Sequence, residues 1–197
     1  ELQKKIAQLE VDVLRTQYLE SVLSEYKKIE EYNSKTLLAE VTTRAPHSSA
    51  GTLVIDAGAQ DGVITGDHVF TAENLLLGTI ARVYDHSSQV NLYTKAGQET
   101  PAVLYPHSES FSLIGNGKGY RAELNRNVEV KEGDVAYSQY EPGRIIAVVQ
   151  KVIFDPRDPF KHVFLSVPLD MNTIQTVGII SPSELPLSLP ITETNTD

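Results

Sequence analysis

Three carboxylates lie close together between Asp56 and Asp67, in the segment DAGAQDGVITGD. Carboxylates ligate Ca²⁺ when they alternate along a loop that ends in a glutamate at its twelfth position. Here the acids are five and six residues apart, and no glutamate closes the segment. The pairs Asp61-Gly62 and Gly66-Asp67 instead match turns between β-strands, where glycine takes a positive φ. The residues therefore favour two tight turns over a metal site.

A glycine-rich segment, GNGKG at residues 115–119, resembles a phosphate cradle only superficially. A P-loop needs the spacing G-x-x-x-x-G-K-[ST] and a helix after it. Gly119 is instead followed by YRAEL, which is typical of a strand. We therefore predict a hairpin at this segment, and no cofactor for the chain.

Histidine, serine and cysteine are the other residue types that commonly carry catalytic chemistry. The five histidines are scattered along the sequence: His47, His68, His86, His107 and His162. Without an i, i+4 pair or any cysteine, they offer no ligand set for zinc or iron. His86 lies beside Asp85 and Ser87, but a triad is assembled in space, and no serine has a G-x-S-x-G context. We therefore expect no catalytic, metal or cofactor residues, and a protein that is not an enzyme.

The charge balance excludes another class of function. The 197 residues carry a net charge of −9 and no basic stripe. Nucleic-acid binding needs clustered lysine and arginine to displace counterions, so it is not expected. No stretch approaches the roughly 20 apolar residues of a membrane-spanning helix.

Residues 1–35 contain neither glycine nor proline, which predicts one long helix. Its apolar positions recur at intervals of three and four, with a register shift after the fourth, and they form the expected dimerisation seam: Leu2, Ile6, Leu9, Val13, Leu19, Val22, Tyr26 and Ile29. At 1.5 Å per residue the helix is about 50 Å long, which exceeds the diameter of a domain of this size. We therefore predict a coiled coil with a second copy of the chain; a helix packed on its own domain is the alternative.

From Leu37 onward the apolar period falls to two, and glycine and proline separate short runs rich in β-branched residues. Twelve such runs are found, at residues 37–44, 52–57, 68–71, 75–84, 89–94, 101–105, 111–115, 119–124, 134–138, 144–154, 162–167 and 177–180. The number is large for one small barrel, so we predict two, each with about six strands.

An internal echo supports two domains, because each half has a Gly-Asp pair, a long apolar strand and a short Val-x-Leu strand. The prediction is a mainly β protein, with a coiled-coil helix at 1–35 and two small, mostly antiparallel six-stranded β-barrels at 36–108 and 109–181. Residues 182–197 are rich in proline, serine and threonine and read as a flexible tail. The residues expected in structural turns are Gly58, Asp61, Gly62, Gly66, Asp67, Gly78, Gly133 and Asp134.

A coiled-coil helix followed by these motifs resembles the extracytoplasmic part of the rod shape-determining protein MreC family. The most specific residues are LVIDAGAQDGV at 53–63, GDHV at 66–69, LGTI at 77–80 and SSQVNL at 87–92. In the second half, Gly133-Asp134, Val167-Pro168 and the closing VGII at 177–180 also fit. The segment AYSQYEPG at 136–143 departs from the family, whose members often carry T-S-G and further glycines there.

The resemblance implies a scaffold of the bacterial elongation complex, which organises peptidoglycan synthesis and maintains rod shape. It also implies a homodimer or higher assembly on the periplasmic side of the inner membrane, with a single-pass anchor upstream of Glu1. The implied partners are the membrane protein MreD, the actin-like MreB and penicillin-binding transpeptidases.

Two other functions remain open from the residues alone. A periplasmic adaptor of an efflux or secretion system also joins a coiled coil to β-barrel modules, but it has a helical hairpin rather than one helix. A protease-like double barrel would need histidine, aspartate and serine side chains within hydrogen-bonding reach in a cleft.

Overall fold

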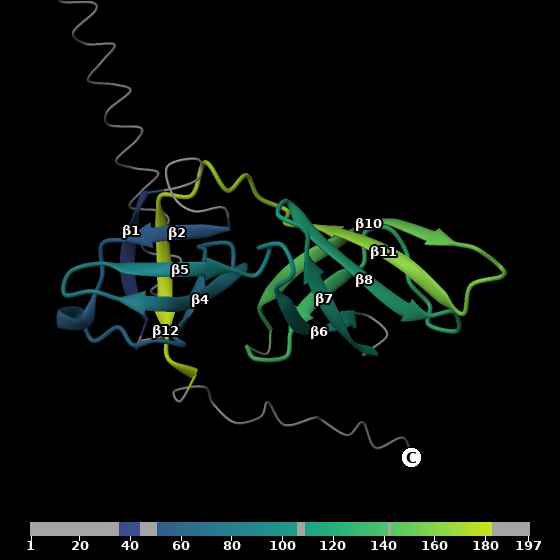
Figure 1. The fold of residues 1–197 in the computed structure, drawn as a ribbon, viewed down its shortest axis with the longest axis horizontal. Coiled ribbons are helices and arrows are strands. Elements are labelled where there is room, and N and C mark those ends of the chain that lie inside the picture. Colours follow the sequence, from purple (N-terminus) through teal and green to yellow (C-terminus); the bar gives the residue numbers. More distant parts are fainter. Residues whose placement is uncertain (1–35, 44–50, 106–108, 142, 183–197) are drawn as a thin grey trace, which may run out of the picture.

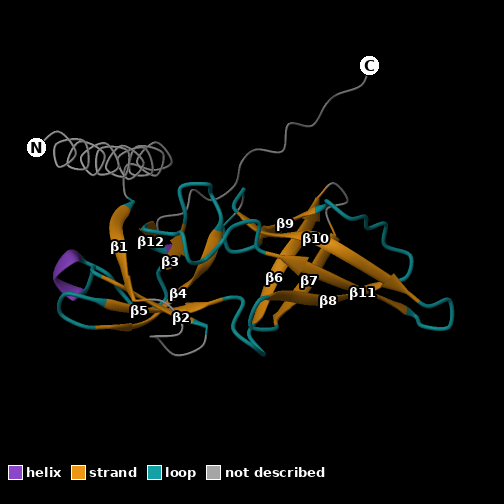
Figure 2. Cartoon of the chain, turned by 90° about the horizontal axis from the view of Figure 1, so that it is seen from above, coloured by secondary structure: helices purple, strands orange, loops and turns teal. Residues whose placement is uncertain are grey.

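The chain forms two closed β-barrels that lie side by side, as the computed structural model shows for residues 36–43, 51–105, 109–141 and 143–182 (Figures 1 and 2). The strands of the first barrel are β1 (Leu37–Thr43), β2 (Thr52–Ile55), β3 (His68–Phe70), β4 (Leu76–Val83), β5 (Ser88–Leu92) and β12 (Thr176–Ile180). Their order around the barrel is β1-β12-β3-β4-β5-β2, with every pair antiparallel. A 3₁₀ turn, η1 (Ala59–Asp61), follows β2.

The second barrel is built from a continuous stretch of sequence. Its strands are β6 (Glu99–Tyr105), β7 (Glu109–Gly115), β8 (Gly119–Asn125), β9 (Val135–Ser138), β10 (Ile145–Phe154) and β11 (Phe160–Ser166). They close in the order β10-β11-β8-β7-β6-β9, again with every pair antiparallel.

The prediction of a mainly β protein with two six-stranded antiparallel barrels is confirmed, and each of the twelve predicted runs overlaps one strand. The predicted helix at 1–35, and with it the whole dimerisation seam, lies outside the described residues, as does the tail from 183 onward. The part of the chain that is described contains no α-helix, so the hairpin of an adaptor is not found there.

The division into 36–108 and 109–181 needs a correction at two strands. β6 was expected in the first domain but pairs with β7 and β9 of the second barrel. β12 was expected in the second domain but pairs with β1 and β3, and so closes the first barrel. The periodicity of a strand shows which face is buried but not which strand is its neighbour, and the prediction assumed that neighbours in sequence share a barrel.

Each barrel has its own apolar interior, because successive side chains of a strand alternate between the inside and the outside. In the first barrel the fully buried residues include Ile55, Val69, Ile80, Val90 and Val177. In the second they include Ala102, Leu104, Leu113, Ala136 and Ile146. Burying a Val, Leu or Ile side chain stabilises by about 1.5–3 kcal/mol, so these interiors are the main source of stability.

Candidate functional site

The predicted turn glycines fall into two groups. Gly62, Gly66 and Gly133 have φ values of +87°, +98° and +93°, which only glycine adopts readily. Gly58 is extended at φ −140° and precedes η1. Gly78 is not in a turn at all: it lies within β4, where a Cβ would stand 2.0 Å from the backbone oxygen of Asn91. Its role is therefore to allow β4 and β5 to approach closely.

The turn aspartates share one geometry. Asp61, Asp67 and Asp134 each accept a hydrogen bond from the backbone N–H three residues earlier, at 2.9, 2.9 and 2.8 Å. Asp67 also accepts one from the Ser181 hydroxyl at 2.6 Å, which ties the end of β12 to the turn before β3. These carboxylates are occupied in holding turns, and no group of three potential metal ligands occurs among the described residues.

The GNGKG segment is the β7–β8 hairpin, as predicted. Asn116 closes it by accepting hydrogen bonds from the backbone of Lys118 and Gly119, at 3.0 and 2.9 Å. The strands on either side pair through Ile114 and Arg121.

The three histidines among the described residues are not brought together. His68 is buried between the barrels, His162 lies on β11, and His86 is exposed. His47 and His107 lie outside the described residues.

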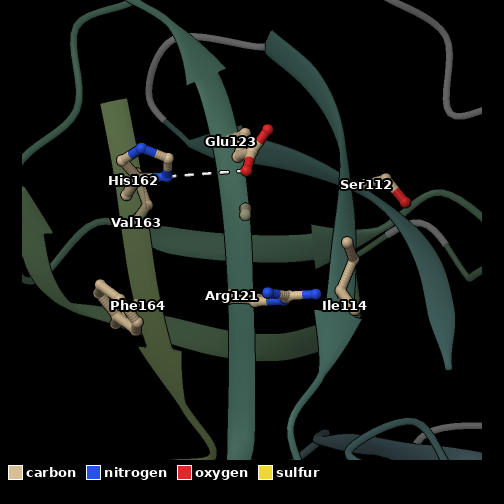
Figure 3. Close-up of a pocket in the computed structure, with 8 residues that line it drawn as sticks. Ser112, Ile114, Arg121, Glu123, His162, Val163 and Phe164 are labelled. Carbon is tan, nitrogen blue, oxygen red and sulfur yellow. Dashed lines mark ion pairs between the residues drawn. The ribbon is translucent and has the colours of Figure 1, made fainter. Parts of the chain in front are cut away.

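A pocket on the outside of the second barrel is the best candidate for a functional surface (Figure 3). Its volume is about 390 Å³, and it is formed by β7, β8 and β11. The residues that line it are Ser112, Ile114, Arg121, Ala122, Glu123, His162, Val163 and Phe164. We call the outward side chains of these three strands the β7–β8–β11 face.

The strand register arranges the β7–β8–β11 face in two rows. Arg121 lies between Ile114 and Phe164 in one row, while Glu123 is paired with His162 in the next. Figure 3 shows Arg121 pointing toward Ile114, and Glu123 and His162 pointing toward one another. The cationic Arg121 thus lies between two apolar side chains, and the polar pair Glu123–His162 lies in the adjacent row.

The charges of this face are unevenly satisfied. His162 stands 3.7 Å from a carboxylate oxygen of Glu123 and 3.1 Å from one of Asp158. The backbone N–H of Phe160, and then His162, lower the pKa of Asp158 from its ordinary value. Arg121, by contrast, is exposed and forms no ion pair with any described residue. Within the described part of the chain, the face therefore presents Arg121 as a cation without an ion-pair partner, beside exposed apolar side chains.

Exposed apolar side chains extend the face along the β10–β11 hairpin. Of the eight large exposed hydrophobic residues in the described part of the chain, four belong to these two strands: Ile153, Phe154, Phe160 and Phe164. Ile153, Phe160 and Phe164 share the side of the face, whereas Phe154 is level with Lys161 and lies on the other side. Ile153 is level with His162 across the strand pair, and Lys151 is level with Phe164. A concentration of this kind marks protein interaction sites, whereas single exposed hydrophobics are ordinary.

This surface is not predicted by the sequence. Phe160, His162 and Phe164 alternate with Lys161, Val163 and Leu165, so the signal was an aromatic series on one side of a strand whose other side is aliphatic. From the sequence alone, such a series cannot be distinguished from core residues, because only the closed barrel shows which side of β11 faces the interior.

A serine protease site is not formed here. Ser112 on β7 and His162 on β11 line the same pocket, but β8 runs between their strands. Two strand spacings amount to about 10 Å, well beyond a hydrogen bond. The arrangement can bind a partner but provides no nucleophile and base in contact.

One further property concerns membranes. Among the residues that the structure describes, there is no helix with both the length and the apolar character that a membrane crossing requires.

Comparisons with known proteins agree on one family. The family model for the barrel core of the rod shape-determining protein MreC matches residues 41–181. A solved structure named MreC has a TM-score of 0.75 and 25% identity, covering 84% of this chain and 98% of that one. MreC from Pseudomonas aeruginosa has a TM-score of 0.68 and 28% identity, covering 75% and 99%.

A third structure is a complex between the penicillin-binding protein PBP2 and MreC from Helicobacter pylori. It matches with a TM-score of 0.53 and 10% identity, covering 74% of this chain and 97% of that one. At that identity the likeness shows the fold alone. Comparison with curated protein sequences finds no match.

Proposed function

This chain belongs to the MreC family of rod shape-determining proteins, and from that premise we propose that it is a scaffold of the bacterial elongation complex. The family consists of non-catalytic structural proteins. In this proposal the chain dimerises through the seam in residues 1–35 and organises enzymes of peptidoglycan synthesis. It does so in the periplasm, held by an anchor upstream of Glu1, with MreD and MreB as further members of the assembly.

We further propose that the β7–β8–β11 face binds a penicillin-binding transpeptidase. The observation that carries this is the exposed Phe164 in the 390 Å³ pocket, beside Arg121, which forms no ion pair with any described residue. Aromatic and arginine side chains are the residues that most often dominate binding energy at protein interfaces. The Helicobacter pylori structure supports the choice of partner, because there an MreC is in complex with PBP2.

Binding of the full-length protein to the transpeptidase of the same bacterium tests this surface. Phe164→Glu places a charge on the apolar part of the face and should weaken binding at least about tenfold, as loss of an interface hot spot does. The matched control is Tyr84→Glu, at an exposed aromatic residue of the first barrel. The surface is misassigned if both variants bind as the unaltered protein does.

The dimer seam needs a separate test. Leu9→Glu with Val22→Glu puts two charges into the apolar stripe of the predicted helix and should convert a dimer into a monomer. Sedimentation of the unaltered chain and of the double variant measures the change directly. If both sediment as the same species, the seam is assigned to the wrong residues.

A further inference from the structure

A buried cluster of charged side chains joins the two barrels at the turn between β9 and β10. Glu141 lies in that turn, and its side chain is only 2% exposed. One carboxylate oxygen is 2.8 Å from Nδ1 of His68 on β3, and the other is 3.6 Å from Nε of Arg144. A single carboxylate from the second barrel therefore faces a histidine of the first barrel and an arginine of its own.

Arg144 extends the cluster into the first barrel. Its guanidinium carbon lies 3.4 Å from the centre of the Phe70 ring, and Nη1 donates a hydrogen bond to the side chain of Asn74 at 2.7 Å. Asn74 in turn donates from its side chain to the carbonyl of Gly143 at 2.9 Å, and its own carbonyl accepts from Ile145 at 3.1 Å. Three hydrogen bonds of Asn74 and the Arg144–Phe70 contact thus connect residues 143–145 to the β3–β4 turn and the end of β3. His68 adds its contacts with Glu141 and with the ring of Tyr140.

Asn74 shows how closely this geometry is fixed. Its φ is +62°, and it is the non-glycine residue with positive φ in the described chain. Such a conformation persists where the surroundings hold it. Its N–H bonds to the Thr71 carbonyl of the same turn at 3.0 Å, while its side chain and its carbonyl are held by groups of the other barrel.

Backbone hydrogen bonds also tie the connecting segment to the second barrel, as from Gly117 N–H to the Thr94 carbonyl at 2.7 Å. The contact between the two barrels themselves is otherwise mainly apolar and has a different character. The cluster of buried side chains that fills the second barrel also includes Phe70, Leu76 and Ile180 from the outside of the first. Burial of apolar surface is non-directional, so it holds the barrels together without fixing their angle. Hydrogen bonds and ion pairs weaken steeply when their geometry is lost, so the charged cluster can fix the angle.

The energetics of buried charges also assign the angle between the barrels to the charged cluster and their cohesion to the apolar contact. A buried ion pair is weak evidence for stability, because removing two charges from water offsets most of their attraction. It can nevertheless select one geometry, since a misplaced partner leaves a buried charge unpaired. When the turn moves away, water hydrates Glu141 and Arg144, so an open arrangement is accessible.

We propose that Glu141, His68 and Arg144 form a latch that sets the angle between the two barrels. When the latch opens, the second barrel turns on its apolar contact about the two segments that join the barrels, residues 93–98 and 167–175. Neither barrel unfolds, because alternation along β3 directs Val69 into the interior and leaves His68 and Phe70 outside. The latch thereby sets where the β7–β8–β11 face stands relative to the first barrel.

The test measures the distance between the barrels. Because the chain has no cysteine, Arg82→Cys in β4 and Gln150→Cys in β10 give two unique spin-label positions, both exposed. Pulsed dipolar spectroscopy on the full chain, diluted with unlabelled chain so that only distances within one molecule contribute, should give one narrow distribution. Glu141→Gln and His68→Ala should broaden it about twofold or more, as additional orientations become populated.

The exposed pair Glu123 and His162 provides matched controls, because it has the same chemistry outside the junction. Glu123→Gln and His162→Ala should leave the distribution unchanged. Hydrogen exchange of the core strands must match the unaltered protein, which separates a change of angle from unfolding. If Glu141→Gln does not fold, His68→Ala carries the comparison, since it retains the Glu141–Arg144 pair. An unchanged distribution in every folded latch variant overturns the proposal.

Discussion

Leu37 in β1 is paired antiparallel with Ile179 in β12, so the first and last described strands are neighbours in one barrel. The second barrel is therefore an insertion between β5 and β12 of the first. All six of its strands come from one stretch of sequence, whereas the first barrel is incomplete until β12 has been made. The two barrels should consequently differ in how they tolerate being cut apart.

A fragment of residues 98–167 should fold on its own, and a fragment of residues 36–97 should not. The first keeps every strand pair of its barrel, while the second leaves β1 and β3 as open edges without β12 between them. Dispersion of amide resonances and cooperative thermal unfolding distinguish the outcomes. Joining residues 174–182 to the shorter fragment through a flexible linker should restore folding. A stably folded fragment without β12 would contradict this reading of the topology.

The strands were predictable from the sequence because their signal is local. Alternation of apolar and polar residues shows itself within a single strand, and all twelve strands were found in this way. Pairing is not local: β6 follows β5 along the chain but pairs with β7 and β9. His68, the partner of Glu141 in the latch, is 73 positions earlier in the sequence. No pattern of residues in either segment predicts this contact.

Gly78→Ala should be far more damaging than Gly97→Ala. At Gly78 a Cβ would meet the backbone oxygen of Asn91 at 2.0 Å, and that backbone is paired with β4 and cannot shift freely. Gly97 has φ +80° but open space around its Cβ position, so only backbone strain opposes alanine. We expect a loss of about 3 kcal/mol or more at Gly78 and about 1 kcal/mol at Gly97. Urea unfolding measures both, and equal losses would show that strand spacing is not the constraint.

Tyr93→Phe should leave stability at neutral pH unchanged or slightly higher. The Tyr93 hydroxyl is buried and has no hydrogen-bond partner among the described residues, so its removal relieves an unpaired polar group. Burial also raises the pKa of Tyr93 above its ordinary value of 10.0. The unfolded chain therefore releases this proton first, and the stability present below pH 10 is lost as the pH rises further.

The alkaline range gives the sharper measurement for this residue. Because of Tyr93, the free energy of unfolding of the unaltered protein should fall by about 1.4 kcal/mol for each pH unit above 10. This contribution should be absent from the phenylalanine variant. Denaturant unfolding at pH 9 and pH 11 gives the difference for each protein. Tyr84→Phe, which removes an exposed hydroxyl, is the control and should follow the unaltered protein. Parallel losses in all three would mean that Tyr93 is hydrated.

Arg121→Glu should weaken transpeptidase binding in a manner that depends on salt. Arg121 is exposed and unpaired among the described residues, and Lys151 lies on the other side of Phe164 from it. If the partner presents a carboxylate to this row, reversing the charge converts attraction into repulsion. The loss of affinity should be larger at about 50 mM salt than at about 500 mM, because exposed charges are screened as the Debye length shortens.

The control is Arg82→Glu, which makes the same change of net charge at an exposed position of the first barrel. Equilibrium binding of each variant at both salt concentrations separates a local contact from the overall field of an already acidic chain. If the contact is local, Arg121→Glu should lose clearly more affinity than Arg82→Glu. The difference between the two losses should also become smaller at high salt. Equal losses would assign the effect to net charge, and a loss that ignores salt would assign the role of Arg121 to packing against Phe164 rather than to its charge.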